Sequence, residues 1–310
     1  MAAISAKLVA ELRQKTGCGM MECKKALVET DGNMDEAIKV LRERGIAVAA
    51  KKQDRIAAEG VVDIAIEGNV GAIIEVNAET DFVAKNELFT SFVKDLLHII
   101  INERPADVAA LAECRYDDEM TVAKKLEELI FKIGEKMTIR RFDIIEGDLI
   151  SYIHGKGQIG VIVKFDSAEA AMANEGYAEA KKNIALHIAA QTAVPYLAKE
   201  DVPASVLDEE KSILLAQLAN DPANAKKPQA VLEKIVVGRL GKFYEANCLL
   251  EQEYVKAENK ESVSKYLEAT GKAFGGDIKI VTFLRYEKGE GLQKREEDFA
   301  AEIEKMVNNK

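Results

Sequence analysis

The stretch EGVVDIAIEGNVGAIIEV, residues 59–76, resembles a second stretch of the same chain, EGDLISYIHGKGQIGVIVKF, residues 146–165. Each contains two runs of β-branched residues around a glycine-containing turn, which is the pattern of a β-hairpin. A further β-rich run follows each hairpin, at residues 137–145 and 278–287. The repeat predicts an α+β fold with two related subdomains, each built from a small antiparallel sheet with helices packed on one face.

Two histidines support the same repeat. His98 follows Gly71 by the same interval as His187 follows Gly160, and each lies in an apolar helical pattern. Histidines in such surroundings are more often hydrogen-bonded core residues than ligands. We therefore expect His98 and His187 to be buried at equivalent positions of the two subdomains.

The chain before the first hairpin predicts three short helices. Ser5 is placed to cap the first and Gly17 to end it, the second runs from about Met21 to Thr30, and the third ends at Gly45. The next stretch, AVAAKKQDRIAAEG, has no apolar stripe of its own. We interpret it as a linker.

A long insertion interrupts the second copy of the repeat. Its apolar residues recur at helical spacing on both sides of the polar loop DPANAKKP, which predicts an antiparallel helical hairpin. These residues are Leu207, Leu214 and Leu218 before the loop, and Leu232, Ile235, Val236, Leu240 and Phe243 after it. Such an arm is expected to bind another helix or a second copy of the chain. The last stretch, LQKREEDFAAEIEKMVNNK, has the pattern of a short amphipathic helix.

These patterns divide the chain into four predicted parts. They are a three-helix module with its linker (1–54), a first core subdomain (55–145), a second core subdomain (146–288) with the helical hairpin at about 200–245, and a C-terminal helical module (289–310).

The composition excludes several classes of protein. Of 310 residues 48% are hydrophobic, yet no run of 18 apolar residues occurs, so no membrane span or membrane partner is expected. The formal net charge of −10 disfavours direct binding of nucleic acid, which requires a basic surface. The four cysteines have no CxxC spacing and there are only three histidines, so we expect no metal site, no cofactor and a cytoplasmic location.

The segment GKGQIG, residues 155–160, matches the G-x-G-x-x-G pattern of dinucleotide sites. Such a site needs a helix after the glycines, whereas the strand-like VIVKF follows here. We interpret GKGQIG as a hairpin turn, and we expect the neighbouring His154 to face outward, where a contact role and no role are equally open. No other motif of a catalytic site is present, so no catalytic residues are predicted.

The stretch TDFVAKN, Thr80 to Asn86, lies where a predicted strand gives way to a helix. Either Thr80 or Asp81 caps the helix and Phe82 packs in the core, or Phe82 is displayed for a partner. An alignment of the two repeats without gaps places Phe82 opposite Ala171. Because the second subdomain builds this corner without an aromatic residue, we predict that Phe82 is displayed.

The adjacent pair Met20 and Met21 follows TGCG at a predicted turn. Neighbouring residues on a helix do not face the same side, so at least one of the two is expected to be exposed. An exposed, flexible methionine is suited to a partner surface.

Several stretches together, ETDFVAKN, LRQKTGCGMMECKKAL, GEKMTIRR, HGKGQIGV and DFAAEI, resemble the elongation factor Ts family over essentially the whole chain. The resemblance implies a ubiquitin-associated-like N-terminal module of three helices, a two-part core, a helical hairpin inserted in the second part and a C-terminal helical module. It also implies a guanine-nucleotide exchange factor for elongation factor Tu, which works by protein–protein binding and is not an enzyme.

The resemblance further implies roles for individual residues. Asp81 and Phe82, within Thr80 to Val83, would press against the GTPase domain of elongation factor Tu and dislodge its Mg²⁺. The same domain would be held from another side by Leu12, Met20 and Met21, and another domain by His154. Whether the helical hairpin joins two copies into a homodimer or is a simple arm is left open.

Two other functions are compatible with parts of the sequence. The chain could be an enzyme that binds nucleotide through GKGQIG, and tight binding of GDP or ATP by the purified chain would favour it. It could also be an adaptor whose N-terminal module binds ubiquitin-like proteins, which a screen for partners would reveal. The adaptor function leaves TDFVAKN unexplained.

Overall fold

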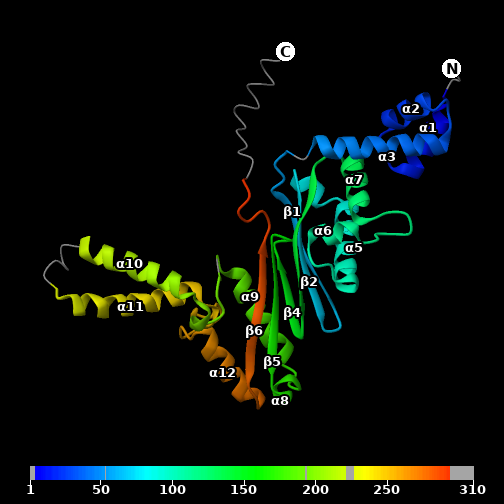
Figure 1. Cartoon of the computed structure of the whole chain (residues 1–310). Helices are drawn as coiled ribbons and strands as arrows, with labels where there is room; N and C mark the ends of the chain where they lie inside the picture. Colours follow the sequence, from blue (N-terminus) through cyan, green and yellow to red (C-terminus); the bar gives the residue numbers. More distant parts are fainter. Residues whose placement is uncertain (1–3, 53, 193, 221–226, 294–310) are drawn as a thin grey trace. The chain divides into compact units, whose positions relative to one another are not determined.

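The computed structural model describes residues 4–52, 54–192, 194–220 and 227–293, which form an α+β structure (Figure 1). It divides into two compact units. Unit 1 comprises the described parts of Met1–Ile144, Gly155–Ile159 and Tyr286–Lys310, and unit 2 those of Ile145–His154 and Gly160–Arg285. Each unit holds one small three-stranded antiparallel sheet, so the predicted fold class is confirmed.

Three helices open unit 1: α1 (Ala6–Thr16), α2 (Met20–Glu29) and α3 (Met34–Lys51). Ser5 Oγ accepts a hydrogen bond from Leu8 N at 3.2 Å, and Gly17 ends α1 in the left-handed conformation, as the sequence predicts. The helices enclose their own apolar core, made of Val9, Leu12, Cys18, Cys23, Ala26, Leu27, Ala37 and Leu41.

The prediction that the third helix ends at Gly45 is wrong, because α3 continues to Lys51. Glycine inside a helix costs only about 0.5–1 kcal/mol relative to alanine, and packing offsets that cost. Gly45 lies against Phe131 of α7 (Val122–Ile133), and Ala49 packs on the core of the adjoining sheet. The first half of the predicted linker is therefore a packed part of this helix.

The sheet of unit 1 has the order β1-β2-β3, from β1 (Glu59–Glu67), β2 (Val70–Ala78) and β3 (Met137–Glu146). β1 and β2 form the predicted antiparallel hairpin, in which Glu59 is opposite Ala78 and Glu67 is opposite Val70. Every residue of the central strand β2 is buried. The sheet therefore provides a rigid base for the segment that follows β2.

Helices cover this sheet. α5 (Glu87–Glu103) lies against β1 and β2, and α6 (Val108–Glu113) and α7 pack beside it (Figure 1). The buried residues of α5 recur at intervals of three and four, which places them on one face of the helix. They are Phe89, Phe92, Val93, Leu96, Leu97, Ile100 and Ile101.

Unit 2 repeats this plan with β4 (Asp148–His154), β5 (Ile159–Ser167) and β6 (Ile278–Glu287) in the order β4-β5-β6. The accompanying helices are α8 (Glu169–Met172), α9 (Tyr177–Ala190) and α12 (Val263–Phe274), with α9 against β4. Two short 3₁₀ helices, Lys199–Asp201 and Leu249–Glu251, complete the described elements of this unit apart from the helical hairpin.

The burial of corresponding residues confirms the internal repeat. All seven buried positions of α5 have a buried counterpart in α9, for example Phe89 with Tyr177, Leu96 with Ile184 and Ile101 with Ala189. The interval between these pairs is one residue shorter than the interval between the hairpin glycines Gly71 and Gly160. The repeats therefore differ by one residue between hairpin and helix.

This difference corrects the prediction for His98. Its counterpart is Leu186, not His187, and one residue on a helix corresponds to a turn of about 100°. His98 is consequently exposed and contacts Glu67, so the expectation of a core histidine is wrong there. His187 is buried as predicted: its Nε2 lies 3.1 Å from Gln252 Oε1, and its Nδ1 accepts a hydrogen bond from Val255 N. Burial lowers the pKa of His187, which keeps the ring neutral.

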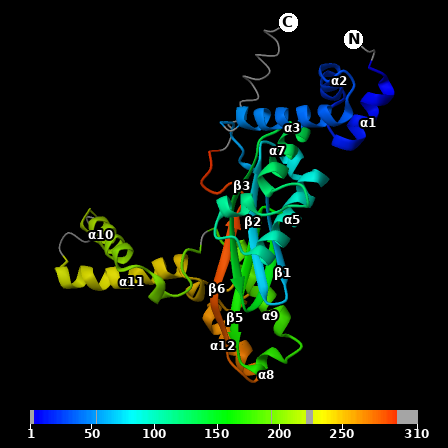
Figure 2. The same ribbon diagram turned by 45° about the vertical axis from the view of Figure 1, so that its right-hand side comes forward.

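The inserted segment of unit 2 forms the predicted helical hairpin from α10 (Ala204–Asn220) and α11 (Gln229–Asn247) (Figure 2). Its contact is apolar, with Leu214, Leu218, Val236 and Leu240 buried along it. Residues 221–226 of the connecting loop lie outside the described residues. So does the predicted C-terminal helix from residue 294 onward.

A buried carboxylate connects three segments of unit 1. Glu75 of β2 is fully buried and accepts hydrogen bonds from Gly289 N at 2.7 Å, Arg140 Nη1 at 2.9 Å and Arg141 Nε at 2.7 Å. Burial alone would raise the pKa of Glu75, but these donors and Asn77 outweigh it and hold the pKa below its usual value. The charged Glu75 thus joins β3 and the segment after β6 to the central strand.

None of the helices in the described ranges is long and apolar enough to cross a membrane.

Candidate functional site

The corner after β2 holds the residues that the sequence singles out. Glu79 and Thr80 lead from β2 into the four-residue helix α4 (Asp81–Ala84). Val83 packs into the core of the sheet and is almost fully buried, whereas the Phe82 side chain is 79% exposed. The core-anchor alternative is therefore wrong, and the prediction that Phe82 is displayed at the surface is confirmed.

The corresponding corner of unit 2 strengthens this interpretation. α8 matches α4 in length, and its buried residue Ala171 takes the place of Val83. The counterpart of Phe82 is therefore the exposed Ala170, one residue before the position that the ungapped alignment gives. The two corners thus both bury an apolar residue at one position, and they differ in the size of the exposed residue before it. The fold does not require an aromatic side chain there.

Thr80 and Asp81 do not cap α4 with their side chains. Thr80 occupies the N-cap position, but its N and Oγ1 both donate to the carboxylate of Glu135 at 3.0 Å. The Asp81 carboxylate is exposed and accepts a hydrogen bond from Lys85 Nζ at 2.5 Å. This contact holds the pKa of Asp81 below its usual value, so the corner presents a negative charge beside Phe82.

A second predicted surface lies at the start of α2. Met20 is 54% and Met21 is 64% exposed, so both methionines of the pair are accessible. Leu12 of α1, by contrast, is fully buried in the core of the three helices. Its side chain supports the turn that carries the methionines and is not part of the surface.

His154 lies at the end of β4 and is exposed, as the sequence predicts. Its Nδ1 is 3.3 Å from the hydroxyl of Tyr152, and the two rings are tilted with their centroids 6.1 Å apart. This contact restricts the histidine ring while leaving one edge open to a partner.

The GKGQIG segment is a hairpin turn between β4 and β5, as predicted. Gly157 has a φ of +92°, and its carbonyl oxygen accepts a hydrogen bond from Val62 N at 2.8 Å. A Cβ atom on Gly157 would lie 3.1 Å from Val61 Cβ, so a larger residue would disturb this approach. The glycine is explained by packing against β1. Because β5 follows instead of a helix, no helix N-terminus is available for a phosphate.

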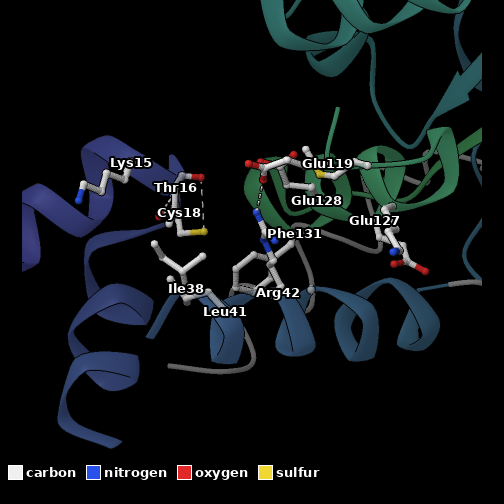
Figure 3. A pocket seen from close by; sticks show the side chains of 13 residues that line it. Lys15, Thr16, Cys18, Ile38, Leu41, Arg42, Glu119, Glu127, Glu128 and Phe131 are labelled. Carbon is white, nitrogen blue, oxygen red and sulfur yellow. Dashed lines mark hydrogen bonds and ion pairs between the residues drawn. The ribbon is translucent and has the colours of Figure 1, made fainter. Parts of the chain in front are cut away.

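A cavity of about 330 Å³ lies between α1, α3 and α7 in unit 1 (Figure 3). Ile38, Leu41 and Phe131 form its apolar side, and Arg42 pairs with Glu119 at 3.1 Å. Three carboxylates (Glu119, Glu127 and Glu128) and three basic side chains (Lys15, Arg42 and Lys124) line it, so the cavity has no excess of positive charge for an anionic phosphate. We regard this cavity as a gap in the packing of α3 on α7 and not as a nucleotide site. Within the described ranges, no cluster of three or more His, Cys, Asp or Glu side chains is arranged to hold a metal ion.

Comparison with known proteins then identifies the family. The family model of elongation factor Ts matches residues 79–290. The chain is 46% identical to elongation factor Ts of Clostridium kluyveri over 99% of the chain and 100% of that relative. It is 43% identical to the protein of Clostridium botulinum strain 657 and 42% identical to that of Syntrophotalea carbinolica, each over 98% of the chain and 99% of the relative.

The chain belongs to the elongation factor Ts family.

Elongation factor Ts is the nucleotide exchange factor for elongation factor Tu in translation elongation, and it is not an enzyme in the catalytic sense. It is a cytoplasmic translation factor, in agreement with the location expected from the cysteine content. Membership in this family removes the alternatives of a nucleotide-dependent enzyme and of an adaptor for ubiquitin-like proteins.

The sequence did not predict two residues that hold the corner after β2. Glu79 and Glu135 both contact backbone N–H groups at the corner, and neither was predicted as a functional residue. Glu135 lies in the GEKMTIRR stretch that contributed to the resemblance, but the sequence gives no sign that it contacts Thr80, 55 positions away. Only the folded structure brings the two together.

Proposed function

We propose that this chain releases GDP from elongation factor Tu by inserting Phe82 into the GTPase domain of that partner and displacing its Mg²⁺. The observation that supports this most is an aromatic side chain, 79% exposed, on a helix fixed from below by Val83. Burying such a side chain in a partner contributes about 1.5–3 kcal/mol, which a solvated phenylalanine does not gain. The neighbouring Asp81 adds a carboxylate, a group that attracts and competes for Mg²⁺.

The mechanism needs no covalent step. A factor that stabilises the nucleotide-free partner lowers the barrier to GDP release, and about 5.5 kcal/mol corresponds to roughly 10⁴-fold in rate. By linkage, bound nucleotide weakens the binding of the factor to the partner as much as the factor weakens the binding of nucleotide. Entry of GTP would therefore release the factor for another cycle.

Mixing the chain with elongation factor Tu that carries a fluorescent GDP tests this function. With excess unlabelled GDP, the fluorescence should decay at a rate that rises with the concentration of the chain and then reaches a plateau. Removing Mg²⁺ with a chelator should speed the uncatalysed decay and reduce the stimulation. A decay unaffected by saturating chain would refute the proposal. The chain alone should leave the fluorescence of free labelled GDP unchanged.

Met20 and Met21 are proposed as a second contact with the same domain, supported from within by the buried Leu12. The double substitution of both methionines by serine should raise the half-saturating concentration of the chain roughly tenfold, since two exposed apolar side chains lose their contact. The melting temperature should stay unchanged because both side chains are exposed. Val28→Ser, an exposed apolar residue near the end of α2, is the matched control. Equal effects of the two changes would contradict a specific role.

His154 is proposed as a contact to another domain of elongation factor Tu.

The α10–α11 hairpin is proposed as a contact between two copies of the chain. Ile213, Val231 and Val237 of the hairpin are exposed apolar residues. Val237→Glu should shift the mass measured by light scattering toward the monomer, since a charge placed in an apolar interface is costly. A monomeric mass for the unmodified chain at high concentration would instead make the hairpin a simple arm.

A further inference from the structure

Two carboxylates, Glu79 and Glu135, hold the corner that carries Phe82. Each accepts hydrogen bonds from the residue that follows the other in the chain. Glu135 accepts hydrogen bonds from Thr80 N and Thr80 Oγ1, each at 3.0 Å. Glu79 Oε1 in turn accepts one from Lys136 N at 2.6 Å. Two adjacent residues before α4 and two adjacent residues after α7 therefore exchange side chain-to-backbone hydrogen bonds. This reciprocal pair fixes the corner to the turn at 134–136.

The contacts have consequences for α4. A helix of one turn has too few internal hydrogen bonds to hold its own direction, so its surroundings decide where its side chains point. Val83 anchors the middle of α4 in the core, and Glu135 fixes the residue immediately before the helix. Together these two points determine the direction of Phe82, which has no contact of its own in the core.

Unit 2 shows that the fold can close the same corner without a carboxylate. Gly134 and Gly275 end α7 and α12 in the same left-handed conformation, with φ of +87° and +83°, so Gly276 corresponds to Glu135. The N–H of Ala168, the counterpart of Thr80, donates to the backbone oxygen of Asp277 at 2.9 Å. A Cβ on Gly276 would lie only 2.5 Å from Ala168 Cβ. In unit 2 the corner is closed by backbone against backbone.

We propose that Glu135 is a positioning residue for nucleotide exchange, which acts through Thr80 to aim Phe82 at elongation factor Tu. The carboxylate occurs only at the corner that displays the aromatic residue, whereas the corner with Ala170 closes without one. Glu135 accepts both donors of Thr80, so α4 is held in one direction before the partner arrives. The inference rests on the proposed role of Phe82.

Kinetics with separate measurement of maximal rate and half-saturating concentration test the inference. Glu135→Ala should lower the maximal rate of GDP release roughly five- to tenfold and change the half-saturating concentration less than about twofold. A misdirected Phe82 slows the step after binding, whereas the initial binding of the partner is little affected. Glu135→Gln keeps an oxygen that accepts from Thr80 N, and it should recover most of the rate. In a chain that already carries Phe82→Ala, the further change Glu135→Ala should have no effect, because the residue that it aims is gone.

Ser262→Ala supplies the control. Ser262 caps α12 through Lys265 N at 3.4 Å, so its loss removes a helix-end contact of unit 2 without touching the corner. It should lower the melting temperature while leaving exchange by the folded protein normal. Normal exchange by Glu135→Ala, or an equal loss with and without Phe82, would overturn the positioning role. Failure of the unmodified chain in the same assay would instead refute the proposed function itself.

Discussion

Replacing Phe82 by alanine should slow the GDP release catalysed by the chain roughly ten- to a hundredfold. Central aromatic anchors of interfaces often lose 2 kcal/mol or more on truncation, and about 1.4 kcal/mol corresponds to each factor of ten in rate. The melting temperature should hardly change, because the Phe82 side chain is 79% exposed and leaves no cavity. The experiment measures both quantities on the same purified variant.

Two further variants make this result specific. Met172 of α8 is an exposed apolar residue on the helix that corresponds to α4, and Met172→Ala should leave exchange unchanged. Val83→Ala removes buried methyl groups and should lower the free energy of unfolding by about 1–3 kcal/mol, a loss of stability that Phe82→Ala should not show. A large drop in melting temperature for Phe82→Ala, with normal exchange by the protein that remains folded, would make Phe82 a structural residue.

Local patterns in the sequence were sufficient to predict several elements of the fold. The alternation of β-branched residues and the glycine turns predicted both hairpins, and the side-chain cap at Ser5 and the left-handed Gly17 follow from short-range chemistry. Phe82 could be placed at the surface because the repeat supplies an internal comparison. The hairpins and the helix ends depend on residues that are close together in the chain, whereas the placement of Phe82 depends on the comparison of the two repeats.

The predictions that failed depended on the exact alignment of the two repeats or on contacts between residues far apart in the chain. His98 was placed in the core because the two repeats were aligned without a gap, and one missing residue turns it by about 100° around α5 to an exposed position. The end of α3 was placed at Gly45 because the contact with Phe131, far along the chain, is invisible in a local pattern. The contact between Thr80 and Glu135 escaped for the same reason.

Glu75→Ala should lower the free energy of unfolding by about 2–4 kcal/mol, which is the largest effect on stability that we expect from a polar residue. Removing one partner of a buried ion pair leaves the other charge uncompensated and typically costs about 3–5 kcal/mol. We expect a smaller loss than this typical cost because Arg140 and Arg141 retain 24% and 31% side-chain exposure and can be partly hydrated. Gly289 N and one donor of Asn77 also lose their acceptor.

The pH dependence of stability separates this charge from simple loss of packing. Because the pKa of Glu75 is lower in the folded chain than its usual value, its charge stabilises the fold above that usual value, about 4.3. The contribution declines as the pH falls below 4.3 and is lost once the pH passes the folded pKa.

Glu75→Gln keeps the shape of the side chain without this charge. The loss in free energy of unfolding relative to the unmodified chain should therefore be full at pH 7 and shrink in acid. Glu268→Gln, at an exposed pair with Lys272, is the control and should leave stability almost unchanged at either pH. A deficit for Glu75→Gln that stays constant from pH 7 to pH 3 would show that Glu75 stabilises the fold by its shape and not by its charge.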